Sequence, residues 1–234
     1  MTYTPDSLVR MTDEFLQVGM KYQHLISEYV TFSTTHPASR EYILHGFVRR
    51  LGTLQRCIQN VFALYHPTRY DIPSRDTCID LTINLQSFVF NLFGCLDNLA
   101  RIWVMERNVT NLKGNPLRDN QIGFLSEIVK ASYAAEFRTY IDEIQQWFSH
   151  LENYRHALAH RIPLYIAPFI ITPSNEATFK SLETEKETAL RQRNFALCDE
   201  LDAKQTSLGK FVPAMTHSLY AEDRYISYIS TANY

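Results

Sequence analysis

Glycine is scarce in this chain, which contains 7 glycines in 234 residues. Soluble proteins average about 7% glycine, and glycine is the default residue for tight turns with left-handed backbone. A chain with so few glycines is poorly suited to a fold built from many hairpins. The scarcity therefore favours long helices joined by short connections.

A secretory signal, a membrane span and a disulfide pattern are not evident either. The segment from Met1 to Asp6 contains no basic stretch followed by an apolar one, and no run approaches the roughly 18 apolar residues that cross a bilayer. The cysteines show no short-range pairing and are typical of free thiols in a reducing compartment: Cys57, Cys78, Cys95 and Cys198. We therefore expect a cytoplasmic protein that does not enter a membrane.

An excess of basic residues is absent as well, because 25 Asp and Glu residues balance 23 Lys and Arg residues. Nucleic-acid-binding domains usually carry a basic stripe, so any contact with RNA must depend on a local patch. The sequence does have a globular composition, with 45% hydrophobic residues. Its length suits one domain, or one domain with an appended piece.

Apolar residues recur at alternating steps of three and four over five long stretches, which predicts five amphipathic helices. The expected helices run over Asp6 to Phe32, Ser39 to Pro67, Arg75 to Asn108, Ala134 to Arg161 and Asn175 to Leu208. Asp6 is expected to cap the first helix. The third helix is apolar over most of its circumference, so we expect it at the centre of a bundle.

The second predicted helix contains two interior glycines, Gly46 and Gly52. Each costs helix stability, up to about 1 kcal/mol relative to alanine, so we expect them to allow close approach of a neighbouring helix. Arg49, Arg50 and Arg56 lie off the apolar face of the same helix. We therefore expect these three side chains in solvent.

The segments between and after the helices complete the predicted fold. Residues 121–130 are expected to form a short helix or an irregular cover, residues 162–173 an extended apolar segment, and residues 210–234 one or two short helices. The chain is thus predicted to be all-α, an up-and-down bundle of four to five long helices, with residues 1–163 as the bundle domain. An extended segment and a C-terminal helical extension, residues 164–234, are expected to pack on the same domain.

Basic side chains gather at the end of the fourth predicted helix, just before Pro163: Arg155, His156, His160 and Arg161. Basic residues in a last turn interact favourably with the negative end of a helix, and that effect alone can explain the group. His156 and His160 are one turn apart, a spacing that can hold a metal ion. No carboxylate lies between them as in the usual two-histidine zinc motif, so we expect no metal.

The same residue types also suit RNA cleavage without a metal. Histidine has an ordinary pKa near neutrality and can act as acid or base at a ribose 2′-hydroxyl. Arginine supplies a planar, permanently charged group for the phosphate. His160 and Arg155 can divide the work in this way, although residues five apart on an ideal helix are turned by about 140° from each other.

Arg155, four further residues and then His160, near the end of a late helix, resemble the signature of the HEPN superfamily of all-helical domains. A polar residue often follows the arginine in that family, and His156 takes that place here. The resemblance covers the two long helices within residues 75–161. It implies a homodimer in which two copies of the motif form one cleft, with no metal and no cofactor.

Active HEPN proteins are metal-independent endoribonucleases and are often toxins paired with an antitoxin protein. The resemblance therefore implies an RNA substrate, a phosphate contact by Arg155, and acid–base catalysis by His160 with help from His156. Other members have lost activity. The alternative for this chain is thus a non-catalytic helical module that binds RNA, a nucleotide or a partner protein.

Further candidates for substrate binding are Arg161, Tyr154 and three polar residues of the third predicted helix, Asp97, Asn98 and Arg101. The three can line the cleft if their helix faces the motif helix. They can equally form a polar patch that satisfies itself or contacts solvent. Tyr154 can stack on a base, or it can belong to the core.

Overall fold

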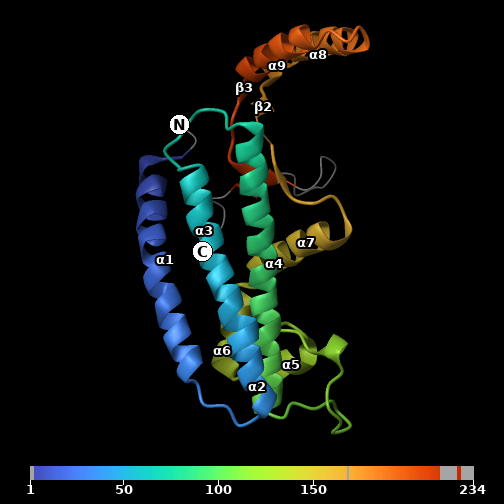
Figure 1. Cartoon of the computed structure of the whole chain (residues 1–234). Coiled ribbons are helices and arrows are strands. Elements are labelled where there is room, and N and C mark those ends of the chain that lie inside the picture. Colours follow the sequence, from blue (N-terminus) through green and yellow to red (C-terminus); the bar gives the residue numbers. More distant parts are fainter. Residues whose placement is uncertain (1–2, 168, 217–225, 228–234) are drawn as a thin grey trace.

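The computed structural model describes residues 3–167, 169–216 and 226–227 (Figure 1). The fold is all-α, as predicted. The helices of the described residues are α1 (Pro5–Thr31), α2 (Pro37–Glu41), the π-helix η1 (Tyr42–Phe47), α3 (Val48–Leu64), α4 (Arg75–Glu106), the 3₁₀ helix η2 (Asp119–Gln121), α5 (Glu127–Ala131), α6 (Ala135–Glu143), α7 (Gln145–His160), the 3₁₀ helix η3 (Pro173–Asn175), α8 (Glu176–Arg191) and α9 (Phe195–Leu208).

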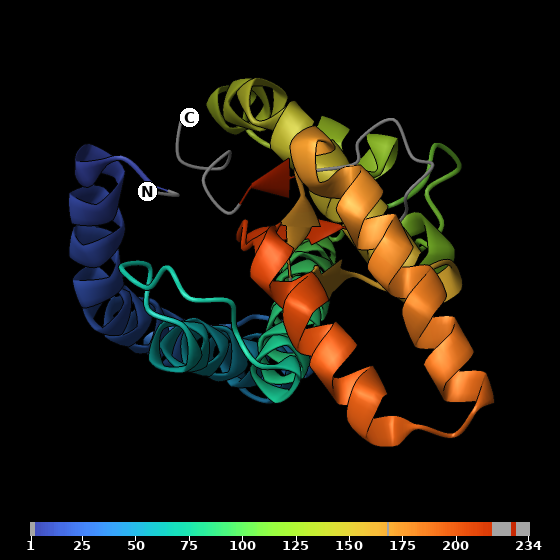
Figure 2. The same cartoon turned by 90° about the horizontal axis from the view of Figure 1, so that it is seen from above.

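Helices α1, α3 and α4 lie side by side as a curved row, and α5, α6 and α7 lie on one face of this row (Figures 1 and 2). Helix α4 is therefore central, as its wide apolar surface predicts. Buried residues of α4 contribute to several separate core clusters, for example Val89 with Leu151 of α7 and Val104 with Val129 of α5. This central position sets which residues face the end of α7.

The N-cap of the first helix lies two residues earlier than predicted. Thr4, and not Asp6, is the N-cap, because the Thr4 side chain accepts a hydrogen bond from the Ser7 backbone N–H at 3.2 Å. Asp6 lies in the first turn, where a carboxylate favours the positive end of a helix. Phe15 stacks on Phe62 of α3 with ring centroids 4.1 Å apart, which attaches α1 to the row.

The second predicted helix runs through a π-helical segment, η1, before α3. Such a segment widens the helix by one residue per turn. Within η1, a Cβ added to Gly46 would lie 2.8 Å from the Asn98 Nδ2 atom of α4. The predicted close approach of a neighbouring helix at this glycine is therefore confirmed.

The fourth predicted helix is broken, so the expectation of one helix from Ala134 to Arg161 is wrong. Ile144, with φ −100° and ψ 14°, ends α6 and precedes α7. The bend lets α7 cross the middle of α4 while α6 stays beside the end of α4 (Figure 1). Ile141 and Phe148, on either side of the bend, still enter one core cluster.

The fifth predicted helix is also broken, and it forms a helical hairpin that projects from the body (Figure 2). Arg193 takes a left-handed backbone conformation with φ 56°, and the Asn194 side chain caps α9 by accepting from the Leu197 N–H at 3.2 Å. The few apolar residues of the two helices pack against one another across the hairpin, for example Ala189 of α8 against Leu201 of α9.

Short strands replace the helices that were predicted for residues 210–234, as far as these are described. They are β3 (Gly209–Lys210), β4 (Ala214–Thr216) and β5 (Ile226–Ser227). Two further strands, β1 (Tyr165–Ile166) and β2 (Ile170–Ile171), lie in the segment that follows α7. The antiparallel order is β1-β4-β5 in one sheet and β2-β3 in the other. Residues 211–213 connect β3 to β4, and residues 217–225 and 228–234 lie outside the described residues. The extended segment predicted over 162–173 is confirmed up to Thr172, apart from residue 168, which also lies outside them, whereas Pro173 begins η3.

The strand after α7 is tied to the bundle through α4. Gln86 Nε2 donates to the Leu164 carbonyl at 2.6 Å, and the Ile166 N–H donates to Thr82 Oγ1 at 3.3 Å. Leu164 and Ile166 are both buried. The segment that follows α7 is therefore anchored to α4.

Helix α4 is long and apolar enough, by length and composition alone, to cross a membrane. The expectation that no run of the sequence has this character is therefore wrong. Core helices of soluble proteins meet the same criterion, so the finding is weak evidence for a membrane span. That the chain stays out of the membrane remains a prediction.

Candidate functional site

The basic residues singled out by the sequence lie at the C-terminal end of α7, which Pro163 follows. The Arg161 N–H donates to the Ala157 carbonyl at 3.0 Å and closes the last turn. The His160 and Arg161 side chains are exposed, and the His156 side chain is 42% exposed. A ligand in solvent can therefore reach three of the four basic groups.

Arg155 points instead toward α4. Its Cζ atom lies 4.5 Å from the centroid of the Phe93 ring, a cation–π contact. Asp97, one turn further along α4, is half-buried, and burial raises the pKa of its carboxyl group, while the positive charges of Arg155, Arg101 and Arg50 act in the opposite direction. The motif helix and α4 thus face each other at Arg155, which is the condition under which Asp97 was expected to line the site.

Asn98 belongs to a polar seam between α3 and α4. Arg50 donates from Nε to Asn98 Oδ1 and from Nη1 to Asn91 Oδ1, both at 3.2 Å. A Cβ added to Gly94 would lie 2.5 Å from the Arg50 guanidinium carbon, so the guanidinium lies directly over this glycine. The expectation that Arg50 is in solvent is therefore wrong.

The sequence contains a signal for this seam that the apolar periodicity hides. Asn91, Gly94 and Asn98 recur at steps of three and four along one face of α4. Two amides flanking a glycine on one face form a recess with hydrogen-bond acceptors on either side. Such a recess suits a long cationic side chain from a neighbouring helix.

Arg101 is turned toward the loop that follows α4. Its Nη1 atom lies 2.8 Å from Asp119 Oδ1, and its Cζ lies 5.7 Å from the Tyr42 ring centroid. The hydrogen bond to Asp119 is the largest of the influences that raise the Arg101 pKa. Arg101 thus lies near Asp97 but has its closest ionic partner in the loop at η2.

The two histidines lie on one face of α7, with ring centroids 6.3 Å apart. His156 Nε2 is 3.7 Å from Glu152 Oε1, one turn earlier. Among the residues that the structure describes, no group of three His, Cys, Asp or Glu side chains is arranged to hold a metal ion. Because α7 is α-helical through His160, Arg155 and His160 leave it in directions about 140° apart.

Tyr154 is a core residue and not a surface one. It is 9% exposed and packs with Val89, Leu151 and Leu164. Its ring is covered by these neighbours, so it offers no face on which a base can stack. The alternative reading of Tyr154 as a core tyrosine therefore holds.

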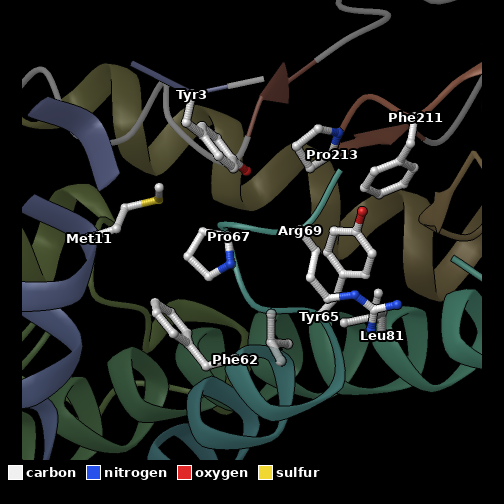
Figure 3. A pocket seen from close by; sticks show the side chains of 10 residues that line it. Tyr3, Met11, Phe62, Tyr65, Pro67, Arg69, Leu81, Phe211 and Pro213 are labelled. Atoms are coloured by element: carbon white, nitrogen blue, oxygen red, sulfur yellow. The ribbon is translucent and has the colours of Figure 1, made fainter. Parts of the chain in front are cut away.

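A small cavity, separate from the basic helix end, lies where the N-terminal residue Tyr3, α3 and the C-terminal segment meet (Figure 3). It is a cavity of about 90 Å³ with mainly apolar walls, including Tyr3, Phe62 and Phe211. Sites for small molecules typically measure about 300–1,000 Å³. The Arg69 Cζ atom lies 4.8 Å from the centroid of the Tyr65 ring, and the Arg69 guanidinium is already ion-paired with Asp71. The cavity is therefore too small for a nucleotide.

Comparisons of the chain with protein-family models, curated proteins and solved structures found no match. What the fold and the site define is thus an all-α protein with an exposed basic helix end.

Proposed function

We propose that this chain is a metal-independent endoribonuclease of HEPN type. The observation that carries the proposal is the collection of one guanidinium and two imidazoles, from Arg155, His156 and His160, within the last turns of one helix that ends in solvent. Arg161 adds a further exposed cation at the same end. This is the local basic patch that RNA binding requires in a chain with a net charge of −2.

In the proposed reaction, an imidazole, that of His160, removes the proton of a ribose 2′-hydroxyl. The resulting oxygen attacks the adjacent phosphorus, and the bond from phosphorus to the 5′-oxygen breaks. A protonated imidazole, that of His156, delivers a proton to the departing oxygen. Arg155 stabilises the additional negative charge on the phosphoryl oxygens. The products are a 2′,3′-cyclic phosphate and a 5′-hydroxyl.

The proposal includes a homodimer. Arg155 and His160 diverge by about 140° on α7, so one copy alone does not present both to the same phosphate. Two copies of the α7 end that meet across a two-fold axis double the number of cations and imidazoles in one cleft. We further propose that the protein acts in the cytoplasm, and that an antitoxin-like partner restrains it.

The test is cleavage of mixed-sequence RNA by the purified protein in EDTA. We expect wild type to leave cyclic phosphate ends, and His160→Ala to lower the rate at least 100-fold, since general acid–base groups contribute about 10²–10⁴-fold. His150→Ala, which removes another imidazole from α7, is the control and should keep full activity. A wild-type protein that leaves diverse RNAs intact contradicts the proposal.

The composite cleft has its own test in sedimentation. Wild type at micromolar concentration should run as a dimer of the 27.3 kDa chain. A single 27.3 kDa species under conditions in which RNA is cleaved contradicts the shared cleft but not the chemistry.

One observation favours the non-catalytic alternative. The Arg155 guanidinium lies on the Phe93 ring and within the electrostatic influence of Asp97, so part of its charge is already engaged inside the protein. A helical module that only binds RNA, a nucleotide or a partner protein needs no free Arg155. Salt-dependent RNA binding without cleavage, lost in Arg161→Ala, would support this alternative.

A further inference from the structure

A cavity larger than the one beside Tyr3 lies away from the basic end of α7. It measures about 640 Å³ and opens between the end of α1, the last two turns of α4 and the segment from Phe124 to Phe137. This volume falls within the range of about 300–1,000 Å³ that is typical of small-molecule sites. None of its lining residues belongs to the basic cluster of α7. The kind of ligand that this cavity can bind therefore depends on its own lining residues and not on the α7 cluster.

Half of the cavity wall is aromatic. Its rings are those of Tyr29, Phe32, Trp103, Phe124, Tyr133 and Phe137. They hold one another in place, since Trp103 meets Tyr133 edge-on at 5.2 Å and Phe124 meets Phe137 edge-on at 6.0 Å. Phe32 and Phe137 are nevertheless exposed. A ligand thus finds aromatic surface that is already ordered and still open to it.

Two carboxylates lie among these rings. Glu106 accepts hydrogen bonds from the backbone N–H and hydroxyl of Thr35, at 2.8 and 2.7 Å, and from the His36 N–H at 3.1 Å. The Ser39 hydroxyl and these groups lower the Glu106 pKa to about 2, so this carboxylate is ionised at neutral pH. Glu28 supplies a second, exposed carboxylate from α1.

One cation, Arg107, also lines the cavity. Its Cζ atom lies 5.0 Å from the centroid of the Trp103 ring, within cation–π distance. The wall thus already holds a positive charge against an aromatic ring. Its carboxylates outnumber its guanidinium group by two to one. This balance disfavours anionic ligands.

We propose that this cavity is a binding site for a small organic cation, an ammonium or quaternary ammonium group carried on an apolar body. The negative faces of aromatic rings attract such a cation, and the interaction is stronger where water is excluded. The negative charges of Glu28 and Glu106 also favour a cation over an anion in this cavity. A neutral apolar ligand gains only the burial of its surface, and an anion is repelled. The site is independent of the proposed RNA cleavage.

Tryptophan fluorescence can report on binding, because the chain has 2 tryptophans, Trp103 in the cavity wall and Trp147 outside it. In a Trp147→Phe protein, checked for native helicity, Trp103 is the only tryptophan, so tryptophan emission reports on the cavity alone. We expect benzyltrimethylammonium to change its emission with saturation below about 1 mM, and phenylacetate to have no effect. Benzyl alcohol should bind more weakly than the cation.

Charge variants of the cavity should shift the affinity for the cation in opposite directions. Glu28→Gln should weaken benzyltrimethylammonium binding about three-fold, and Arg107→Gln should tighten it by a similar factor. Neither should change the affinity for benzyl alcohol. Phe32→Leu, which removes a ring but keeps apolar area, should weaken cation binding two- to five-fold, consistent with about 0.5–1 kcal/mol for an exposed cation–π contact.

Phe195→Leu is the control, because it removes another exposed ring, at the tip of the α8–α9 hairpin and outside the cavity. Cation affinity should be unchanged in it. The proposal is overturned if phenylacetate binds as tightly as benzyltrimethylammonium, or if the emission of folded protein shows no saturation up to about 10 mM cation. It is equally overturned if Glu28→Gln and Phe32→Leu both bind the cation as wild type does.

Discussion

Replacing Gly94 by alanine should destabilise the protein, although the same change usually stabilises a helix. An interior glycine costs about 1 kcal/mol relative to alanine. At Gly94, however, the new methyl group would lie 2.5 Å from the Arg50 guanidinium, which must then leave Asn91 and Asn98. Hydrogen bonds to charged groups contribute about 1.5–3 kcal/mol each, and the lower value applies here because these groups are half-buried. Two lost bonds, about 3 kcal/mol, exceed the gain of about 1 kcal/mol, so we expect a net loss of about 2 kcal/mol.

Urea unfolding of matched variants measures this effect. Gly19→Ala is the control, since no atom lies within 4 Å of the added methyl group in α1, and it should stabilise by up to about 1 kcal/mol. In an Arg50→Ala background the obstacle is gone, so Gly94→Ala should also stabilise. The coupling between the two sites should then be about 3 kcal/mol. If Gly94→Ala stabilises the wild-type protein as much as Gly19→Ala does, the described position of Arg50 over Gly94 is wrong.

Three further predictions concern charge and backbone strain. Glu106→Gln should destabilise the protein at pH 7, and the difference in urea midpoint from wild type should shrink toward pH 3. The reason is that a Glu106 pKa lowered from 4.5 to about 2 gives stability that is present above pH 4.5 and is lost as the pH falls. Asp97→Asn should be at least as stable as wild type at pH 7, since burial raises the Asp97 pKa and its ionised form opposes folding; the advantage should vanish below about pH 4. Arg193→Gly should slow hydrogen exchange in the α8–α9 hairpin by relieving a φ of 56°, at about 1 kcal/mol, whereas Arg191→Gly within α8 should accelerate it.

Apolar periodicity predicted the helices because burial of one face is what forms them. The limits of α4, Arg75–Glu106, lie within two residues of the prediction, and its first residue follows Ser74, whose hydroxyl caps the helix. The same periodicity could not reveal the bend at Ile144. Ile141 and Phe148 are seven residues apart and keep one face on either side of it. Neither glycine nor proline marks that position.

The break between α8 and α9 had a local signal that was too weak to compete with helix-forming neighbours. Asn194 is a favourable N-cap, but asparagine also occurs within helices. The break lets Leu201 of α9 be buried in a cluster with Ala189 and Leu182 of α8. Partner contacts of this kind are tertiary and have no counterpart in a linear pattern.

Arg155 and His160 were both named from the sequence, but the packing around them, which the sequence did not reveal, decides what replacing each of them can show. Arg155 faces Phe93 and Asp97 in the packed interior side of α7, so its replacement alters helix packing as well as any phosphate contact. His160 is exposed at the helix end. Its replacement therefore leaves the core untouched, and a loss of RNA cleavage in His160→Ala at unchanged unfolding midpoint reports chemistry alone. A loss of activity in Arg155→Ala can be attributed to catalysis only if Phe93→Leu, which removes the ring beneath the guanidinium, retains activity.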